Sequence, residues 1–211
     1  MNITVPENVI RRLPRYLRLL YRLSEEGVTN VSSAELGREL GFTPSQIRQD
    51  FSHFGKFGQQ GYGYNVDLLR REISVILGMD RGYKAVLIGA GNLGKALMCN
   101  FSFEQSGVEI VAAFDANPAM TGRTINGIAV YDISQLSEYA ARSTVNIAVL
   151  CVPKSALGVV TNLIAKTEIN SVWNFTNQEL SLPENVIVEN IHFSDSLLTL
   201  GYRLSDSLAV Q

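Results

Sequence analysis

Three glycines with a fixed spacing are the clearest sign of a ligand-binding site in this sequence. Gly89, Gly91 and Gly94 form a GxGxxG pattern between the apolar run Lys84–Ile88, a predicted buried strand, and the predicted helix Lys95–Phe101. In that context the first glycine allows a tight turn, the second lets a pyrophosphate approach the backbone, and the third lets helix and strand pack closely. The phosphates then meet the free N–H groups of a helix N-terminus. The candidate phosphate-binding residues are Gly89, Ala90, Gly91, Asn92, Leu93 and Gly94.

Asp115 is the second candidate, because it ends the predicted strand Glu109–Phe114 and stands about twenty residues after the last glycine. A carboxylate there accepts hydrogen bonds from both hydroxyls of an adenosine ribose and repels a 2′-phosphate, which favours NAD(H) over NADP(H). The alternative is a turn residue before Asn117 and Pro118.

The chain after Asp115 is predicted to complete a Rossmann fold. Strands are expected over Asn146–Cys151 and Ser171–Asn174, with a helix over Ser155–Lys166 between them. Ligands of parallel sheets bind beyond the carboxyl ends of the strands. The nicotinamide half of the cofactor is therefore expected beside Val152, Pro153, Asn174 and Phe175.

The N-terminal part has the pattern of a helix-turn-helix. Helices are predicted over Arg15–Ser24, from Ser32 or Ser33 to Gly41, and from Pro44 to about Phe54. Thr43 is expected to cap the third helix, with Gln46 as its reciprocal partner in a capping box. The third helix is the one that would enter a major groove of DNA.

A glycine-rich segment follows the third helix. Gly55–Tyr64 has four glycines in ten residues, alternating with aromatic and polar groups, which suits a hairpin wing that lies on DNA. The alternative is a helical bundle with a glycine-rich loop that binds no DNA. A linking helix over Val66–Leu77, capped by Asn65, leads to the expected domain boundary. The candidate DNA-binding residues are Ser45, Gln46, Arg48, Gln49, Ser52, His53, Lys56, Gln59, Gln60 and Tyr62.

Composition places limits on the class of protein. The 211 residues suit two small domains, and the net charge of −2 divides unevenly, with eight basic against six acidic residues in 1–63 and eight against eleven in 81–211. No membrane span, signal peptide or metal-ligand spacing is expected. Cys99 and Cys151 are predicted to be reduced, buried thiols of a cytoplasmic protein, with a redox-sensing disulfide as the alternative.

An NAD-dependent oxidoreductase with an accessory N-terminal helical domain is the rival hypothesis. Only about thirty-five residues follow the last predicted strand, too few for a substrate domain, and the two histidines, His53 and His192, have no evident carboxylate partner. We therefore predict no catalytic residues and no enzyme activity, with the dinucleotide acting as a signal.

The last predicted helix, Phe193–Ser205, carries apolar residues around most of its circumference. Such a helix needs burial on several sides, which a position between two subunits provides. Packing on the chain's own Rossmann sheet is the alternative.

In this order, these elements resemble the Rex family of redox-sensing repressors over nearly the whole chain. The specific marks are Arg48–Ser52, the glycine-rich wing, Gly89–Gly94, Asn174–Phe175 and Glu189–Ile191. The resemblance implies an α/β protein with a winged-helix domain over 1–80 including the linking helix, a Rossmann domain with a parallel sheet over 81–191, and a domain-swapped dimerisation helix over 192–211.

The resemblance also implies a mechanism. A homodimer would bind a palindromic DNA operator, and NADH would close the dimer and release it, so that genes of anaerobic and fermentative metabolism are expressed. NAD⁺ would compete with NADH while permitting DNA binding. Phe193 would reach the partner's nicotinamide, and Arg18 would help to link the cofactor to the winged helix.

Four positions depart from the commoner family pattern. Gln49 and Gln60 stand where many members have a basic residue in the recognition helix and in the wing, so operator sequence or affinity is expected to differ. Asn100 and His192 stand where some members have a tyrosine and an aspartate that bond across the dimer. His192 is a candidate for a pH-dependent NADH response, and a surface or helix-capping histidine is the alternative.

Overall fold

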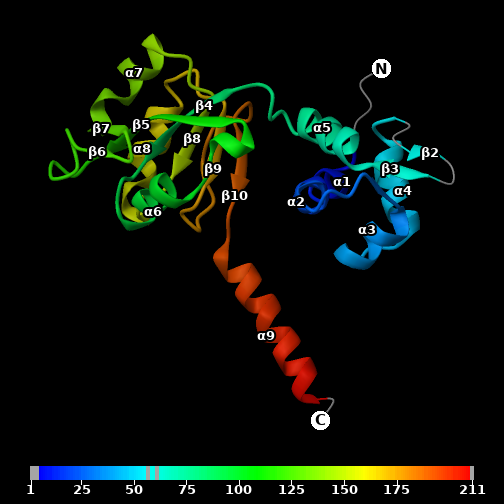
Figure 1. The fold of residues 1–211 in the computed structure, drawn as a ribbon. Coiled ribbons are helices and arrows are strands. Elements are labelled where there is room, and N and C mark those ends of the chain that lie inside the picture. Colours follow the sequence, from blue (N-terminus) through cyan, green and yellow to red (C-terminus); the bar gives the residue numbers. More distant parts are fainter. Residues whose placement is uncertain (1–4, 56–57, 60–61, 210–211) are drawn as a thin grey trace. The chain divides into compact units, whose positions relative to one another are not determined.

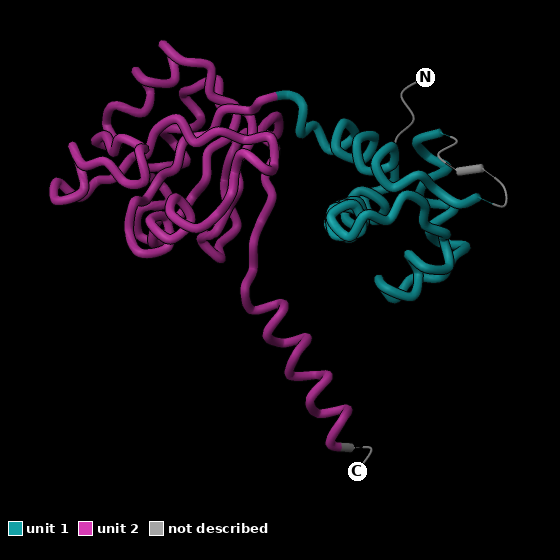
Figure 2. The backbone as a smooth tube through the Cα atoms, viewed as in Figure 1, with its two compact units in different colours: residues 1–81 teal, residues 82–211 magenta. Residues whose placement is uncertain are grey.

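The computed structural model describes residues 5–55, 58–59 and 62–209. The chain divides into two compact units, Met1–Arg81 and Gly82–Gln211 (Figure 2). Each unit has its own hydrophobic core.

The first unit is a winged helix, as predicted. Its helices are α1 (Glu7–Ile10), α2 (Leu13–Glu25), α3 (Ser33–Leu40), α4 (Pro44–Ser52) and α5 (Val66–Ile76), as Figure 1 shows. Strands β1 (Asn30–Val31), β2 (Gly58–Gln59) and β3 (Gly63–Asn65) form an antiparallel sheet in the order β1-β3-β2. Helices α3 and α4 form the helix-turn-helix, and β2 and β3 form the wing.

The caps of α3 and α4 follow local chemistry, with one correction. The Ser32 hydroxyl accepts the Glu35 N–H (3.1 Å) and the Glu35 carboxylate accepts the Ser32 N–H (2.7 Å), and these bonds lower the pKa of Glu35. The Thr43 hydroxyl accepts the Gln46 N–H at 3.2 Å and caps α4 as expected. The predicted reciprocal bond from Gln46 is wrong, because the Gln46 side chain donates to Asp50 Oδ1 at 2.9 Å instead.

A buried carboxylate joins α4 to α2. Asp50 is fully buried and accepts two hydrogen bonds from the Arg12 guanidinium, at 2.7 and 2.8 Å. It also accepts the Tyr16 hydroxyl at 2.7 Å, and Tyr16 is itself fully buried. Burial raises the pKa of Asp50, but the bonds from Arg12, Tyr16 and Gln46 outweigh it and hold that pKa below its usual value. Burial and the bond to Asp50 raise the pKa of Tyr16.

The second unit is a doubly wound α/β sheet. Its parallel strands stand in the order β10-β9-β8-β4-β5-β7, and the edge strand β6 pairs antiparallel with β7. Numbered along the chain, the parallel strands have the Rossmann order 3-2-1-4-5-6. Their bounds are β4 (Tyr83–Ile88), β5 (Val108–Asp115), β6 (Thr124–Ile125), β7 (Ile128–Asp132), β8 (Ile147–Leu150), β9 (Ser171–Asn174) and β10 (Ile187–Asn190).

Helices cover the two faces of this sheet unequally. Ala85 and Leu87 of β4 face the core that contains Met98 of α6 (Asn92–Asn100). Val86 and Ile88 face the opposite core, formed with α7 (Leu136–Arg142) and α8 (Leu157–Ile164). Strands β4, β5, β8 and β9 and helices α6 and α8 lie where the sequence predicts them, whereas β6, β7, α7 and β10 were not predicted.

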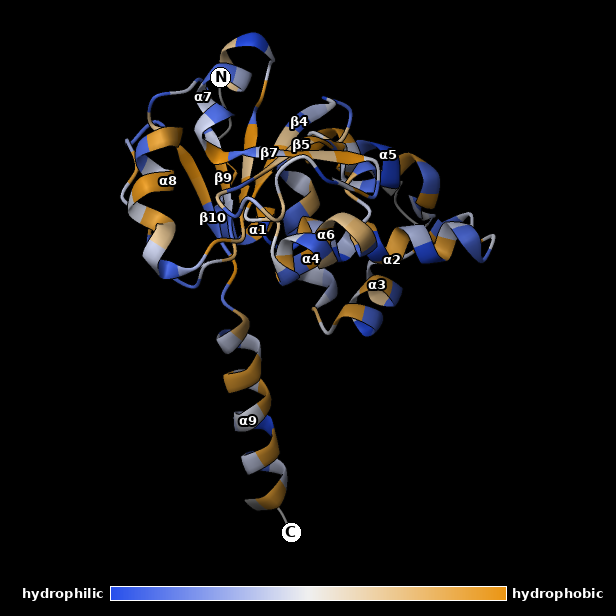
Figure 3. Ribbon diagram, turned by 90° about the vertical axis from the view of Figure 1, so that its left-hand side faces the viewer, coloured by the Kyte–Doolittle hydropathy of each residue, from blue (hydrophilic) through white to orange (hydrophobic). Residues whose placement is uncertain are grey.

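The terminal helix α9 (Phe193–Ala209) leaves its apolar side chains uncovered. They are Phe193, Leu197, Leu198, Leu200, Tyr202, Leu204 and Leu208, each 59–72% exposed. In Figure 3 orange apolar segments appear along the whole helix. Packing of this helix on the chain's own sheet, the alternative raised by the sequence, is therefore wrong.

The Asp50 cluster generates a stability prediction. Asp50→Ala leaves Arg12 and Tyr16 without their buried partner, so we expect the first unit to lose about 3–5 kcal/mol of unfolding free energy at pH 7. The exposed ion pair between Arg22 and Glu39 also joins two helices of this unit, and Glu39→Ala is expected to cost less than about 1 kcal/mol. Native-state hydrogen exchange of the α4 amides measures the loss of stability in both variants. Equal losses would contradict the conclusion that the buried Asp50 cluster stabilises this unit more than the exposed ion pair does.

The same cluster predicts a pH dependence. The pKa of Asp50 is lower in the folded chain than in the unfolded chain, where it is about 3.9. Asp50 therefore contributes fully to the free energy of unfolding above the unfolded pKa, and this contribution is lost as the pH falls through the folded pKa. The unfolding free energies of wild type and Asp50→Ala, measured by hydrogen exchange of the α4 amides at decreasing pH, should therefore converge at low pH.

Candidate functional site

The sheet has a topological switch point between β4 and β8. These neighbouring strands are parallel, and the chain passes from β4 to α6 on one face and from β8 to α8 on the other. In doubly wound sheets such diverging connections leave a crevice beyond the carboxyl ends of the two strands, and ligands bind there. The candidate residues Val152 and Pro153 directly follow β8, and the glycine loop directly follows β4.

The three glycines of the loop have separable roles. Gly89 has φ +98°, and a Cβ there would lie 2.6 Å from the carbonyl oxygen of Cys151. A Cβ at Gly94 would lie 2.0 Å from the carbonyl oxygen of Gly89. A Cβ at Gly91 would meet no atom within 4 Å. The fold itself thus requires Gly89 and Gly94, while Gly91 keeps free the space in front of α6.

The first turn of α6 is suited to an anion. Gly91 is its N-cap and supplies no side chain to accept hydrogen bonds, and no acidic residue stands in the first turn. The N–H groups of a first helical turn have no partner within the helix, and the helix dipole adds partial positive charge there. Asn92 and Leu93 thus present their N–H groups to the crevice, and this arrangement fits a pyrophosphate.

Asp115 lies at the rim of this loop. Its carboxylate accepts the Ala90 N–H through Oδ2 and the Asn117 N–H through Oδ1, both at 2.7 Å. The N–H of Ala90 is therefore engaged with Asp115 rather than available to a phosphate. Each carboxylate oxygen can accept a further hydrogen bond, so the turn function, which the sequence analysis raised as the alternative, is compatible with a ribose contact.

A polar network fixes the carboxyl end of β9. Asn174 is buried, and its amide donates to Asn190 Oδ1 and to the Gln178 carbonyl, each at 2.8 Å. Its Oδ1 accepts the N–H and the hydroxyl of Thr176. These bonds hold Phe175, the next residue, in an aromatic array with Trp173 (ring centroids 4.6 Å apart) and Phe193 (6.2 Å).

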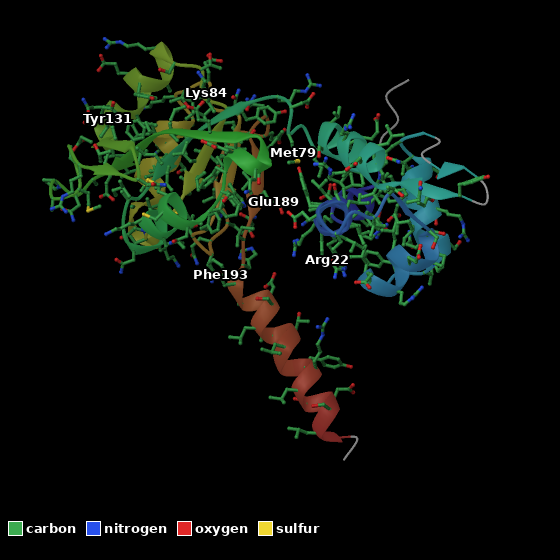
Figure 4. The ribbon with its side chains drawn as sticks, in the orientation of Figure 1. Arg22, Met79, Lys84, Tyr131, Glu189 and Phe193 are labelled. Atoms are coloured by element: carbon green, nitrogen blue, oxygen red, sulfur yellow. The ribbon has the colours of Figure 1, made fainter. Side chains whose placement is uncertain are left out.

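The residues assigned to coupling belong to different elements of the chain. His192 Nδ1 lies 2.9 Å from Asn177 Oδ1, so its partner is an amide and not a carboxylate. Asn100 donates to the Ala96 carbonyl of its own helix at 3.0 Å. Phe193, labelled in Figure 4, opens α9. Arg18 belongs to the first unit, and its coupling role stays a prediction.

The cysteines do not form a reactive pair. Both are free: Cys99 is exposed, so the expectation of a buried thiol is wrong for that residue, and Cys151 is only partly buried. Burial raises the pKa of Cys151 to about 12, which keeps this thiol protonated beside the crevice.

The proposed DNA-reading face of α4 is only partly free. Arg48, Gln49 and Ser52 are exposed, and Arg48 donates to the Ser33 hydroxyl at 3.0 Å. Ser45 is exposed in the first turn, whereas Gln46 is held by Asp50 and His53 is half-buried at the C-cap. Tyr62 of the wing is 78% exposed. Lys56 and Gln60 lie outside the described residues, as does the side chain of Gln59.

Asp50, Arg12 and Tyr16 are the residues that sequence reasoning missed. A usable signal was present, because Asp50 stands one helical turn from Ile47 and next to Phe51, both on the buried face of α4. A charge at such a position requires a buried partner.

Within residues 5–55, 58–59 and 62–209, no group of histidine, cysteine and acidic residues could hold a metal ion. None of the described helices is long and apolar enough to cross a membrane.

Two family descriptions match the chain. Residues 4–52 match "Putative DNA-binding protein N-terminus", and residues 80–178 match "CoA binding domain". Curated relatives include the "Redox-sensing transcriptional repressor Rex" of Clostridium botulinum strain Hall, 49% identical over 192 residues and 91% of each chain. The protein of the same name from Clostridioides difficile strain 630 is 48% identical over 97% of this chain and 98% of its own.

Solved structures agree with these relatives. A Rex-family repressor called RSP matches with a TM-score of 0.90 and 42% identity over 97% of this chain and 96% of its own. Complexes of RSP with NADH (41% identity, covering 98% and 97%) and with NAD⁺ and operator DNA (44% identity, covering 98% and 95%) have the same TM-score.

A winged helix combined with a Rossmann unit defines a transcription regulator of the ligand-sensing class. The identities and coverage show that this chain belongs to the Rex family of redox-sensing transcriptional repressors. Its relatives are repressors and not enzymes, which confirms the prediction of a regulator.

The glycine geometry predicts that two similar substitutions differ in their effect on stability. Gly94→Ala forces a methyl group against the Gly89 carbonyl, so we expect the second unit to lose about 3 kcal/mol of stability. Gly91→Ala should change stability by less than about 1 kcal/mol, because its methyl group meets no atom. Urea unfolding followed by fluorescence of Trp173, the one tryptophan, reports on this unit. Equal destabilisation by both substitutions would show that Gly91 is structural.

Proposed function

We propose that this chain is an NADH-sensing repressor that binds operator DNA through its winged helix and leaves the operator when NADH binds. The observation that carries the proposal is that one chain joins a helix-turn-helix to a glycine loop and carboxylate at a Rossmann switch point. The similarity to RSP, solved with NADH and with NAD⁺ and operator DNA, supports it over nearly the whole chain.

The cofactor would lie across the switch point. The N–H groups of Asn92 and Leu93 would bind the pyrophosphate, and Gly91 would admit it. Asp115 would bind the adenosine ribose and exclude a 2′-phosphate. The nicotinamide would lie beside Val152, Pro153, Asn174 and Phe175. Its oxidised or reduced state is what the protein would distinguish. The chain's residues there bind and orient the ring, since none is a paired acid or base.

The DNA would contact α4 and the wing. Ser45, Arg48, Gln49 and Ser52 are exposed on α4 and would reach base edges or phosphates in a major groove. The hydrogen bond to Ser33 holds Arg48 in place before DNA arrives. The wing residues Lys56, Gln59, Gln60 and Tyr62 would contact the sugar-phosphate backbone of the DNA.

A second copy of the chain is the proposed partner of α9. The connection between β9 and β10, residues 175–186, contains no helix, and Phe101, Trp173 and Phe175 form an aromatic surface on the α6 side of the sheet. Phe101 is 41% exposed there. One chain therefore presents both an uncovered apolar helix and a partly exposed aromatic surface, which two copies can bury reciprocally. The dimer, in the cytoplasm, would read a palindrome.

DNA release by NADH is the central prediction. In fluorescence anisotropy at fixed salt, the protein on a labelled palindromic operator from its own promoter region should be released by NADH and much less by NAD⁺. Asp115→Ala should require more than about tenfold higher NADH while binding DNA normally. Arg48→Ala should weaken DNA binding at least about tenfold with unchanged NADH affinity. Tight NADH binding without specific DNA binding would instead favour the oxidoreductase hypothesis.

Dimerisation through α9 gives a separate prediction. Leu198 is 72% exposed in the single chain, and Leu198→Glu places a charge where burial is proposed. We expect sedimentation equilibrium to show at least about a hundredfold weaker dimerisation. Thr199→Glu, on the polar side of α9, is the control and should stay within about threefold. A dimer unaffected by Leu198→Glu would exclude α9 from the interface.

A further inference from the structure

Two aspartates stand side by side at the carboxyl ends of neighbouring strands. Asp115 ends β5 and Asp132 ends β7, and these strands pair in parallel with the two residues in register. Residues paired in this way have Cα atoms about 5 Å apart, because that is the spacing of strands in a sheet. Asp132 was not a candidate residue in the sequence, because β7 was not predicted.

Both carboxylates lie on the face of the sheet that α6 covers. Side chains alternate between the two faces along a strand. In β7, Tyr131 (labelled in Figure 4) belongs to the core on the α7 and α8 side, and Val130 belongs to the core on the α6 side. Asp132 follows Tyr131 and therefore faces the α6 side. Strand β5 alternates in the same way, so Asp115 shares this face, which is also that of the glycine loop.

The two aspartates are bonded to uncharged groups. Oδ1 of Asp132 caps the short helical turn Ile133–Gln135 and accepts the N–H and the hydroxyl of Ser134, at 2.9 and 2.6 Å. These bonds lower the pKa of Asp132, so its carboxylate is ionised at neutral pH. Among the residues that the structure describes, none donates a hydrogen bond to Oδ2 of Asp132, and none forms an ion pair with either aspartate.

The stability of the sheet does not explain this pair of charges. Like charges directly opposite each other on neighbouring strands destabilise a sheet. The cap does not require a charge either, because asparagine and serine cap a helical turn about as well as aspartate does. The pair lies instead at the adenosine end of the cofactor site, which the glycine loop and the space in front of Gly91 define independently of it.

We propose that Asp132 is a specificity-determining residue of this site, and that it adds to Asp115 a second negative charge that rejects a phosphorylated ribose. This inference rests on the proposed function, since it concerns the same cofactor. The hydroxyl groups of an unmodified ribose are donors that suit carboxylate oxygens. A 2′-phosphate brings about two further negative charges to a place that already has two.

The position of Asp132 makes its effect one of charge at a distance. Asp115 is the residue that would touch the ribose, while Asp132 lies one strand farther and would act through the electrostatic potential. The reduced nicotinamide of NADPH is chemically the same as that of NADH, so the ribose is where the two dinucleotides differ. With both carboxylates present, the protein would respond to NADH and not to NADPH.

The test compares the dissociation constants of NADPH and NADH for the full chain at low salt. Energy transfer from Trp173, the one tryptophan, to the reduced nicotinamide measures both. Asp132→Asn keeps the cap and removes the charge, and we expect it to lower the ratio of the NADPH constant to the NADH constant at least about fivefold. Asp132→Ser, a second neutral cap, should lower the ratio in the same way.

Glu109→Gln is the matched control. It removes the same charge from the amino end of β5, six residues and about 20 Å from Asp115 along the strand. Its ratio should stay within about twofold of the wild-type ratio, because this distance exceeds the screening length of about 10 Å at 0.1 M salt.

Ionic strength separates a charge effect from a structural one. The wild-type ratio should fall as salt rises from about 50 mM to about 500 mM, and the ratio of Asp132→Asn should fall less. Tight NADH binding with the same ratio in wild type and both Asp132 variants, or a wild-type ratio that salt does not change, would overturn the role of Asp132. A wild type that does not bind NADH would contradict the proposed function itself, and this inference with it.

Discussion

The fully buried carboxylate of Asp50 is the interaction on which the DNA-reading part of this protein depends. A buried charge is costly unless it is paired and hydrogen-bonded, and Asp50 has three partners: Arg12 at the N-cap of α2, Tyr16 within α2, and Gln46 of α4 itself. Since α4 carries the carboxylate and the arginine stands at the start of α2, the recognition helix cannot rotate about its axis without breaking the pair. The aromatic contact between Tyr16 and Phe51, with centroids 4.9 Å apart, restrains the same rotation. Such a restraint holds Arg48 and Gln49 on the opposite side of the helix in a constant direction.

The second unit depends on close backbone approach instead of charge. The loop after β4 passes beside Cys151 and the first turn of α6 returns against Gly89, and both approaches exclude any side chain. Because these contacts consume Gly89 and Gly94, Gly91 is the one glycine of the pattern that the protein does not need for its own packing. This division separates the residues that form the loop from the residue that admits a ligand. The Asp115 carboxylate then ties the loop to the neighbouring strand β5 through Ala90.

Local signals predicted most of the fold, and long-range pairing accounts for what they missed. The capping residues Ser32, Thr43 and Asn65 and the left-handed Gly41 are short-range features, and the structure places helix ends where they stand. Strands β7 (Ile-Ala-Val-Tyr-Asp) and β10 (Ile-Val-Glu-Asn) do not alternate apolar with polar residues in sequence, so only their neighbours in the sheet define them. The glycine pattern and Asp115 were predictable from spacing. The hydrogen bond from Gln46 to Asp50 was not predictable in this way. It depends on the burial of Asp50 against Arg12, which lies thirty-eight positions away in the sequence.

The helix-free connection between β9 and β10 has a consequence for how this protein matures. An ordinary doubly wound domain supplies its own helices to cover both sides of its sheet, and it is complete when it leaves the ribosome. Here residues 175–186 contain no helix, and the chain's last helix is turned outward with its apolar side chains in solvent. A newly made chain therefore exposes apolar surface on α9, and this exposure favours aggregation or proteolysis until a partner, which we propose to be a second copy, covers it. In the proposed dimer this covering depends on chain concentration, so chains present at low concentration keep the surface exposed for longer.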